Sequence, residues 1–169
     1  MSDMLMREDA TQPAGPPKLD SLAHVSLPCR DLAEGKTFYI DVLGGKLRVD
    51  HPEFAAITIA GSEIGIGTAG CTFIEPGNEY PHVAFYCGPD EIVAMKQWLA
   101  RCGIPTSNFW TRAGVEVLMF FRDPSGNMIE LFCTRGFKGA DKLPKGPQRG
   151  HGIAVDVDAL RYDTWTPPA

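Results

Sequence analysis

Two histidines and one glutamate stand at matching places in a chain that reads as internally duplicated. His24 begins the segment HVSLPC and His82 begins HVAFYC, so histidine and cysteine recur at the same offset. Glu130 lies near the end of the second copy. Two imidazoles and one carboxylate, all on strands, can hold one face of a divalent metal and leave other coordination positions open. We therefore predict that His24, His82 and Glu130 form a metal site suited to non-haem Fe(II) chemistry.

The strand pattern directs these side chains away from the aliphatic core. In the predicted strand 22–27, alternation puts His24 and Ser26 on one face and the aliphatic side chains on the other. In the predicted strand 128–132, Glu130 likewise lies opposite the aliphatic positions. The first copy has Gly65 where the second has Glu130, because GSEIG aligns with GNMIE.

The elements of the first copy follow the order βαβββ. After strand 22–27, a helix is predicted between Asp31 and Gly44, and strands at 47–49, 56–59 and 63–67. The second copy repeats this order, with a helix from about residue 89 to 103 and strands at 115–121 and 128–132. We predict an α+β fold of two βαβββ modules, residues 20–75 and 78–135, whose curved mixed sheet surrounds the metal.

Both ends of the chain lie outside this repeat. Residues 1–19 are rich in Pro, Gly and Ala and predict a flexible N-terminal arm. Residues 136–169 form a C-terminal extension with a basic, Gly- and Pro-rich start. Residues 153–160 predict a short added strand, and the aromatic end predicts a tail that wraps the domain or a neighbouring subunit.

Composition restricts the class of protein and of partner. A formal charge of -5 over 169 residues argues against nucleic acid, and no apolar run approaches the length of a membrane span. The five cysteines show no CxxC spacing and are interpreted as reduced, buried thiols. We expect a cytoplasmic protein that acts on a small molecule, and a homodimer, since curved sheets leave open edges.

The sequence also contains a glycine motif found in dinucleotide-binding proteins, but without the helix that such a site needs. Residues 65–70 match GxGxxG, but no helix opening follows, and a dinucleotide site needs a helix N-terminus for the pyrophosphate.

Residues 20–135 resemble the vicinal oxygen chelate superfamily, which contains glyoxalases, bleomycin resistance proteins, fosfomycin thiol transferases and type I extradiol dioxygenases. The resemblance rests on Asp31-Leu32, Phe38-Tyr39 and Val42-Leu43-Gly44, and on the segment FRDPSGNMIEL at 121–131. It implies that His24, His82 and Glu130 are the metal ligands. It also puts the fourth ligand of glyoxalases at Gly65, and the functional tyrosine of dioxygenases and fosfomycin enzymes at Phe120.

The resulting expectation is an Fe(II)-dependent dioxygenase that opens the ring of a catechol. Three protein ligands leave three positions, enough for two vicinal substrate oxygens and dioxygen. The alternatives are a glyoxalase- or thiol-transferase-like enzyme, with Mn(II) or Zn(II) as Lewis acid, and a bleomycin-resistance-type binding protein. Tyr86, on the face of His82, is the candidate catalytic group. The candidate substrate contacts are Ser26, Arg112, Phe120 and Arg122.

Overall fold

The computed structural model describes residues 21–78, 80–146 and 155–168, and it contains two sheets, each with its own helical layer. The first sheet has the order β1-β4-β3-β2 and the second β5-β7-β6. The strands are β1 (His24–Pro28), β2 (Lys46–Asp50), β3 (Phe54–Ile59), β4 (Ser62–Gly67), β5 (His82–Tyr86), β6 (Val117–Arg122) and β7 (Met128–Cys133). The helices are α1 (Leu32–Thr37) with its π-helical continuation η1 (Phe38–Val42), α2 (Pro89–Arg101) and the short 3-10 turn η2 (Ala140–Lys142).

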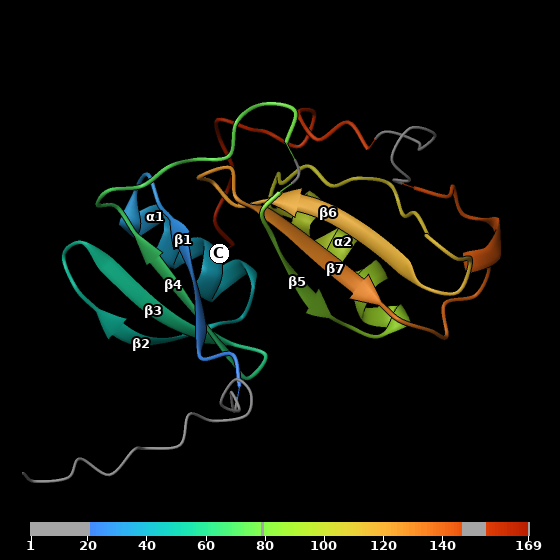
Figure 1. Cartoon of the computed structure of the whole chain (residues 1–169), viewed down its shortest axis with the longest axis horizontal. Helices are drawn as coiled ribbons and strands as arrows, with labels where there is room; N and C mark the ends of the chain where they lie inside the picture. The colour runs from blue at the N-terminus through green and yellow to red at the C-terminus, as the bar shows by residue number, and fades with distance from the viewer. Residues whose placement is uncertain (1–20, 79, 147–154, 169) are drawn as a thin grey trace, which may run out of the picture.

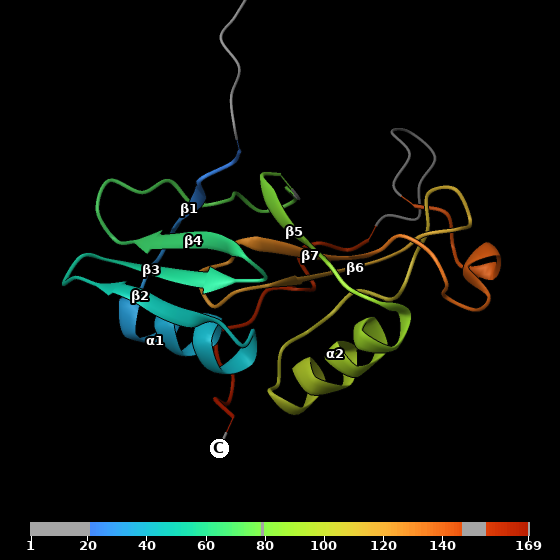
Figure 2. The same ribbon diagram turned by 90° about the horizontal axis from the view of Figure 1, so that it is seen from below.

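The two modules lie side by side, with the first sheet on the left and the second on the right of Figure 1. Figure 2 shows α1 and α2 on the same side of the two sheets, so the other faces of both sheets point the same way. We call these the open faces. The predicted α+β class with mixed sheets and duplicated modules is confirmed.

Alternation along the strands separates the core from the open face. Val25 and Leu27 of β1 pack against the main core, as do the buried Ile129 and Leu131 of β7. This core lies between the sheets and the helices, where burial of each large aliphatic side chain contributes about 1.5–3 kcal/mol. The intervening positions of β1 and β7 are therefore the ones that carry His24 and Glu130 on the open faces.

The first helix starts as predicted and ends differently. The Asp31 carboxylate caps it by accepting the Glu34 N–H at 3.0 Å. Its last turns are π-helical, since the Leu43 N–H donates to the Phe38 carbonyl five residues back at 3.2 Å. The wider turn buries both Phe38 and Tyr39 against the sheet.

The second module departs from the predicted order after its helix. The structure forms two strands there, β6 and β7, and isolated bridges join Thr106 to Phe121 and Trp110 to Leu118. Residues 104–111 therefore follow the edge of β6 without making a regular ladder. The predicted strand 153–160 is also absent over residues 155–160, while 153 and 154 fall outside the described residues. The predicted flexible arm, 1–19, is likewise outside them.

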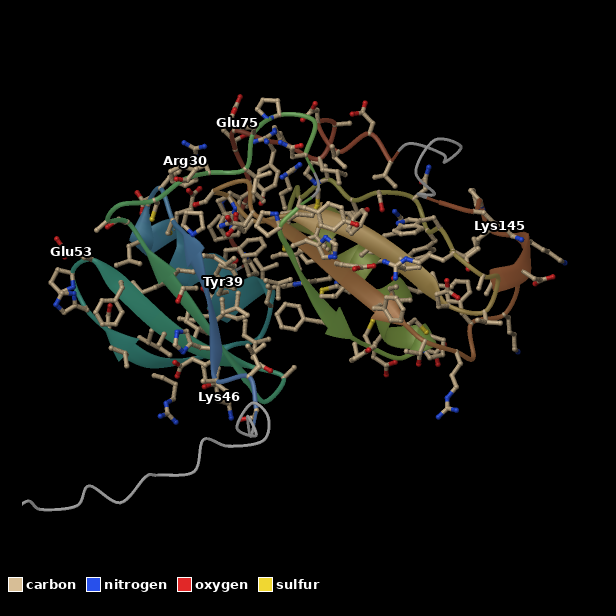
Figure 3. The ribbon with its side chains drawn as sticks, in the orientation of Figure 1. Arg30, Tyr39, Lys46, Glu53, Glu75 and Lys145 are labelled. Atoms are coloured by element: carbon tan, nitrogen blue, oxygen red, sulfur yellow. The ribbon has the colours of Figure 1, made fainter. Side chains whose placement is uncertain are left out.

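Hydrogen bonds and packing join the modules around the turn that follows β6. The Tyr39 hydroxyl donates to Asp123 Oδ2 at 2.9 Å, and the Arg30 N–H donates to Ser125 Oγ at 2.9 Å. Trp98 of α2 donates its indole N–H to the Val42 carbonyl at 3.1 Å. In Figure 3, Tyr39 lies within the first module, whereas Glu53 lies at its rim. No helix within the described ranges is long and apolar enough to span a membrane.

Candidate metal centre

His82 and Glu130 form a close pair on the open face of the second sheet. His82 starts β5 and Glu130 lies in the middle of β7, its direct neighbour. His82 Nε2 lies 3.1 Å from Glu130 Oε2, and their side chains are 15% and 3% exposed. Two ligand atoms at adjacent positions of an octahedral ion, each about 2.1 Å from it, are about 3 Å apart. The spacing therefore fits two neighbouring ligands of one divalent ion.

These two residues line a cavity of about 350 Å³. Tyr86 and Phe132 also line it, and their rings meet edge to face with centroids 5.6 Å apart. Tyr86 is 79% exposed, so its hydroxyl belongs to the mouth of the cavity rather than its floor. Tyr86, the predicted catalytic residue, thus lines the same cavity as His82 and Glu130.

Arg112 lies at the same cavity and faces the outer oxygen of the carboxylate. Its Nη2 is 3.5 Å from Glu130 Oε1, and its guanidinium lies 5.6 Å from the ring centroids of both Trp110 and Phe132. Its side chain is 52% exposed. The two rings thus hold the guanidinium beside Glu130.

Glu116 holds the loop that carries Arg112. Its Oε1 accepts the backbone N–H groups of Arg112 at 2.7 Å and Ala113 at 2.9 Å. Burial alone would raise the pKa of this carboxyl, but the hydrogen bonds from backbone N–H groups keep it below its ordinary value. Sequence reasoning missed Glu116; its one signal is an acidic residue just after an Arg-Ala-Gly turn.

His24, the third predicted ligand, lies at a different cavity. It lines a hollow of about 530 Å³ on the open face of the first sheet, together with Ser26, Glu63 and Gly65. In the parts of the chain that the structure describes, no three His, Cys, Asp or Glu side chains gather closely enough to hold a metal ion. The chain therefore brings two of the three predicted ligands together and presents the third on the neighbouring module.

The strand registers support the alignment of the two copies. Ser26 pairs with Gly65 between parallel β1 and β4, just as Ala84 pairs with Glu130 between parallel β5 and β7. Gly65 thus occupies the place of Glu130 in the first module. A Cβ atom there would lie 3.0 Å from the Ser26 hydroxyl, so a side chain at residue 65 would need that hydroxyl to move by a few tenths of an ångström.

The remaining predicted contacts lie elsewhere. Phe120 is the partner of Glu130 in β6, but it is 1% exposed and covered by other side chains. Its ring centroid is 5.5 Å from that of His82. Arg122 is fully buried and donates to the carbonyls of Gly126 at 2.6 Å, Asn78 at 3.0 Å and Val157 at 3.2 Å. Arg122 therefore anchors backbone segments and does not line the cavity of His82 and Glu130.

Residues 21–131 match the Glyoxalase/Bleomycin resistance protein/Dioxygenase superfamily. The chain belongs to this superfamily. Over 159 residues it is 33% identical to Glyoxylase I 4 of Arabidopsis thaliana, which covers 86% of this chain and 83% of the relative.

Two solved structures share the fold. The fosfomycin resistance protein FosX of Listeria monocytogenes has a TM-score of 0.62 at 21% identity, over 69% of this chain and 93% of that one. Lactoylglutathione lyase of Agrobacterium tumefaciens has a TM-score of 0.57 at 20% identity, over 70% of this chain and 95% of that one. A FosX variant has been solved in complex with Mn(II) and a dihydroxypropylphosphonic acid.

Proposed function

We propose that this chain is a divalent-metal enzyme that isomerises or cleaves a small, anionic, α-oxygenated substrate, with the metal as a Lewis acid. The observation that carries the proposal is the His82–Glu130 pair at 3.1 Å with Arg112 beside it. The likeness to a glyoxalase I relative over 86% of the chain supports the same class. A glyoxalase-type reaction, the isomerisation of a hemithioacetal to a hydroxyacyl thioester, is the specific form that we propose.

His82 and Glu130 would hold the metal together with His24 of a second copy of the chain. The reason is geometric, because His24 lies at the cavity of the first module and the pair at the cavity of the second. Both open faces point the same way, so the face of one copy can cover the face of another (Figure 2). A homodimer of this kind would give each site ligands from two chains.

When bound, the metal would polarise the substrate oxygens and stabilise the negative charge that develops on them. Side chains of the protein would bind the substrate and transfer the proton. Arg112 would hold the anionic group of the substrate next to Glu130. Tyr86, at the mouth of the cavity, would carry a proton between substrate and solvent.

A catechol dioxygenase is the second candidate function. The position of the functional tyrosine in those enzymes is Phe120, which has no hydroxyl and is buried. What favours it is the ligand set, since Gly65 supplies no fourth side chain and leaves more positions for substrate and dioxygen. Fe(II) belongs to that second candidate, whereas Mn(II) and Zn(II) suit the Lewis-acid reaction.

Metal-depleted protein reloaded with Mn(II), Zn(II) or Fe(II) tests the two candidates. We expect Mn(II) or Zn(II) to support isomerisation of the hemithioacetal of methylglyoxal and glutathione without dioxygen. H82A and E130A should each weaken metal binding at least tenfold, because each removes a ligand, whereas H51A removes an exposed histidine and should not. Oxygen consumption with a catechol by the Fe(II) form alone would favour the dioxygenase, and unchanged metal affinity in H82A and E130A would refute the site.

A further inference from the structure

We propose that Arg112, positioned by Glu116, holds one oxygen of Glu130 away from the metal, so that this carboxylate binds the ion through Oε2 alone. A carboxylate that binds through one oxygen takes one coordination position, whereas one that binds through both oxygens takes two. The arginine would thus keep one more position open to substrate oxygens. The inference rests on the metal site proposed above and names the residues that set its coordination number.

The two oxygens of the Glu130 carboxylate have different neighbours. Oε2 lies 3.1 Å from His82 Nε2, on the side where the two ligands meet. Oε1 accepts a hydrogen bond from Arg112 Nη2 at 3.5 Å. The Glu130 side chain is only 3% exposed, so solvent has little access to either oxygen. Because the guanidinium attracts Oε1 and repels a second cation near it, the metal is directed to Oε2.

An aromatic ring on the same strand helps to hold the guanidinium beside the carboxylate. Phe132 follows Glu130 by two residues in β7, so both side chains project from the same face of the sheet. The Arg112 guanidinium lies 5.6 Å from the centroid of the Phe132 ring. Since the Arg112 side chain is 52% exposed, its orientation depends on such contacts and on its backbone rather than on burial.

Glu116 fixes the backbone from which the arginine extends. Its Oε1 accepts the N–H groups of Arg112 at 2.7 Å and Ala113 at 2.9 Å, and the residue is 7% exposed. Both N–H groups would lose this partner if the carboxylate were removed. Glu116 does not line the cavity of His82 and Glu130. It therefore acts on the site through Arg112, as a positioning residue.

Thr111 ties the start of the same turn to the rest of the molecule. Its hydroxyl accepts the Gly114 N–H at 2.8 Å, its N–H donates to the Pro144 carbonyl at 3.0 Å, and its carbonyl accepts the Gly146 N–H at 2.9 Å. Gly114 has a φ of +84°, in the left-handed region that favours glycine. The turn thus has a fixed backbone, from which the Arg112 side chain reaches Glu130.

The number of water molecules on bound Mn(II), measured by water-proton relaxation, tests this assignment without any turnover. Three protein ligands, with Glu130 bound through one oxygen, leave three positions for water on an octahedral ion. In R112A the freed Oε1 also binds, so we expect the loss of one water and of about one third of the relaxation enhancement. Mn(II) itself should still bind, because R112A retains all three ligands.

Variants of Glu116 test whether it acts through the arginine. We expect E116A to lose one water as R112A does, and the double variant R112A/E116A to lose no more than R112A alone. E116D, a milder change, keeps the charge but withdraws the acceptor by one methylene group, and it should show part of the same loss.

R101A is the matched control, because Arg101 is an exposed arginine that also lies over a tryptophan ring, 5.2 Å from the centroid of Trp98, but does not line the cavity. It should keep the wild-type water count. An unchanged count in R112A, or an equal loss in R101A, would overturn the role of the arginine while Mn(II) binding still supports the metal site. A loss in R112A with none in E116A and E116D would overturn the role of Glu116. A wild-type chain that binds no Mn(II) would overturn both proposals together.

Discussion

At the scale of single residues, alternation along a strand predicts which face a side chain takes but not what covers that face. His82 and Glu130 are predicted as ligands of one metal ion, and the structure places their side chains 3.1 Å apart on one open face. Phe120 and Arg122 lie on that same face, yet both are buried under chain that follows residue 131. The alternation at 153–160 predicts a strand, but the structure forms none over 155–160, so the position of this covering segment depends on tertiary contacts that no local signal reports.

Asp123, in the turn between β6 and β7, gives a prediction about stability and pH. Burial, offset only in part by hydrogen bonds from Asn127, Tyr39 and Ser125, raises the pKa of this carboxyl from 3.8 to about 6. The folded state therefore holds this proton more tightly than the unfolded chain does. The stabilising contribution is fully present below about pH 4 and is lost as the pH rises through 6.

Urea unfolding of the wild type and D123N between pH 4 and 7.5 would measure the contribution of the Asp123 carboxyl to stability. We expect the free energy of unfolding of the wild type, relative to that of the variant, to fall by roughly 3 kcal/mol across this range. A difference that stays constant with pH would show that Asp123 has an ordinary pKa.

At the scale of elements, propensity predicted the two long helices and most strands, and it failed where the chain makes irregular contacts. Residues 104–111 contain Pro105 and several short polar side chains, and they run beside β6 with isolated bridges only. The predicted fourth strand of the second module is therefore replaced by a looser edge. Proline removes a backbone donor, which is one physical reason why a ladder does not form there.

At Gly35 in α1, helix propensity favours alanine, whereas packing against the sheet disfavours it. A Cβ atom at this position would lie 2.6 Å from Cys29 Sγ and 3.0 Å from Ile66 Cδ1, because α1 lies directly against the sheet. G35A gains about 1 kcal/mol of helix propensity but loses about 1–3 kcal/mol to overpacking. We expect a net decrease in the free energy of unfolding, measured by urea titration.

A33G, at an exposed position of the same helix, is the control. It should lose about 1 kcal/mol from propensity alone. If G35A were more stable than the wild type, the close approach of α1 to the sheet would be wrong.

At the scale of the whole molecule, the duplication predicts three ligands but not which chain supplies each one. The sequence gives equivalent places to His24 and His82, and the structure puts them at separate cavities. Where the two modules stand relative to each other depends on contacts such as the one between Trp98 and Val42, which join residues 56 positions apart. Such contacts have no signature in local periodicity.

Mixing two inactive variants tests whether the site forms between copies of the chain. H24A and E130A each lose one ligand, but co-expressed chains would form mixed dimers in which one of the two sites keeps all three ligands. For random pairing, about one quarter of all sites would then be intact, and both metal binding and activity should return to about that level. A site formed within one chain would show no recovery, and the separately expressed variants serve as controls.

The strand register around Gly65 bears on how the two halves of the chain could have diverged. The partner of Glu130 is Ala84, whereas the partner of Gly65 is Ser26, whose hydroxyl would lie 3.0 Å from any added Cβ atom. A side chain at residue 65 would therefore need the Ser26 hydroxyl to move aside by a few tenths of an ångström, so replacements at the two positions are coupled as the two halves diverge.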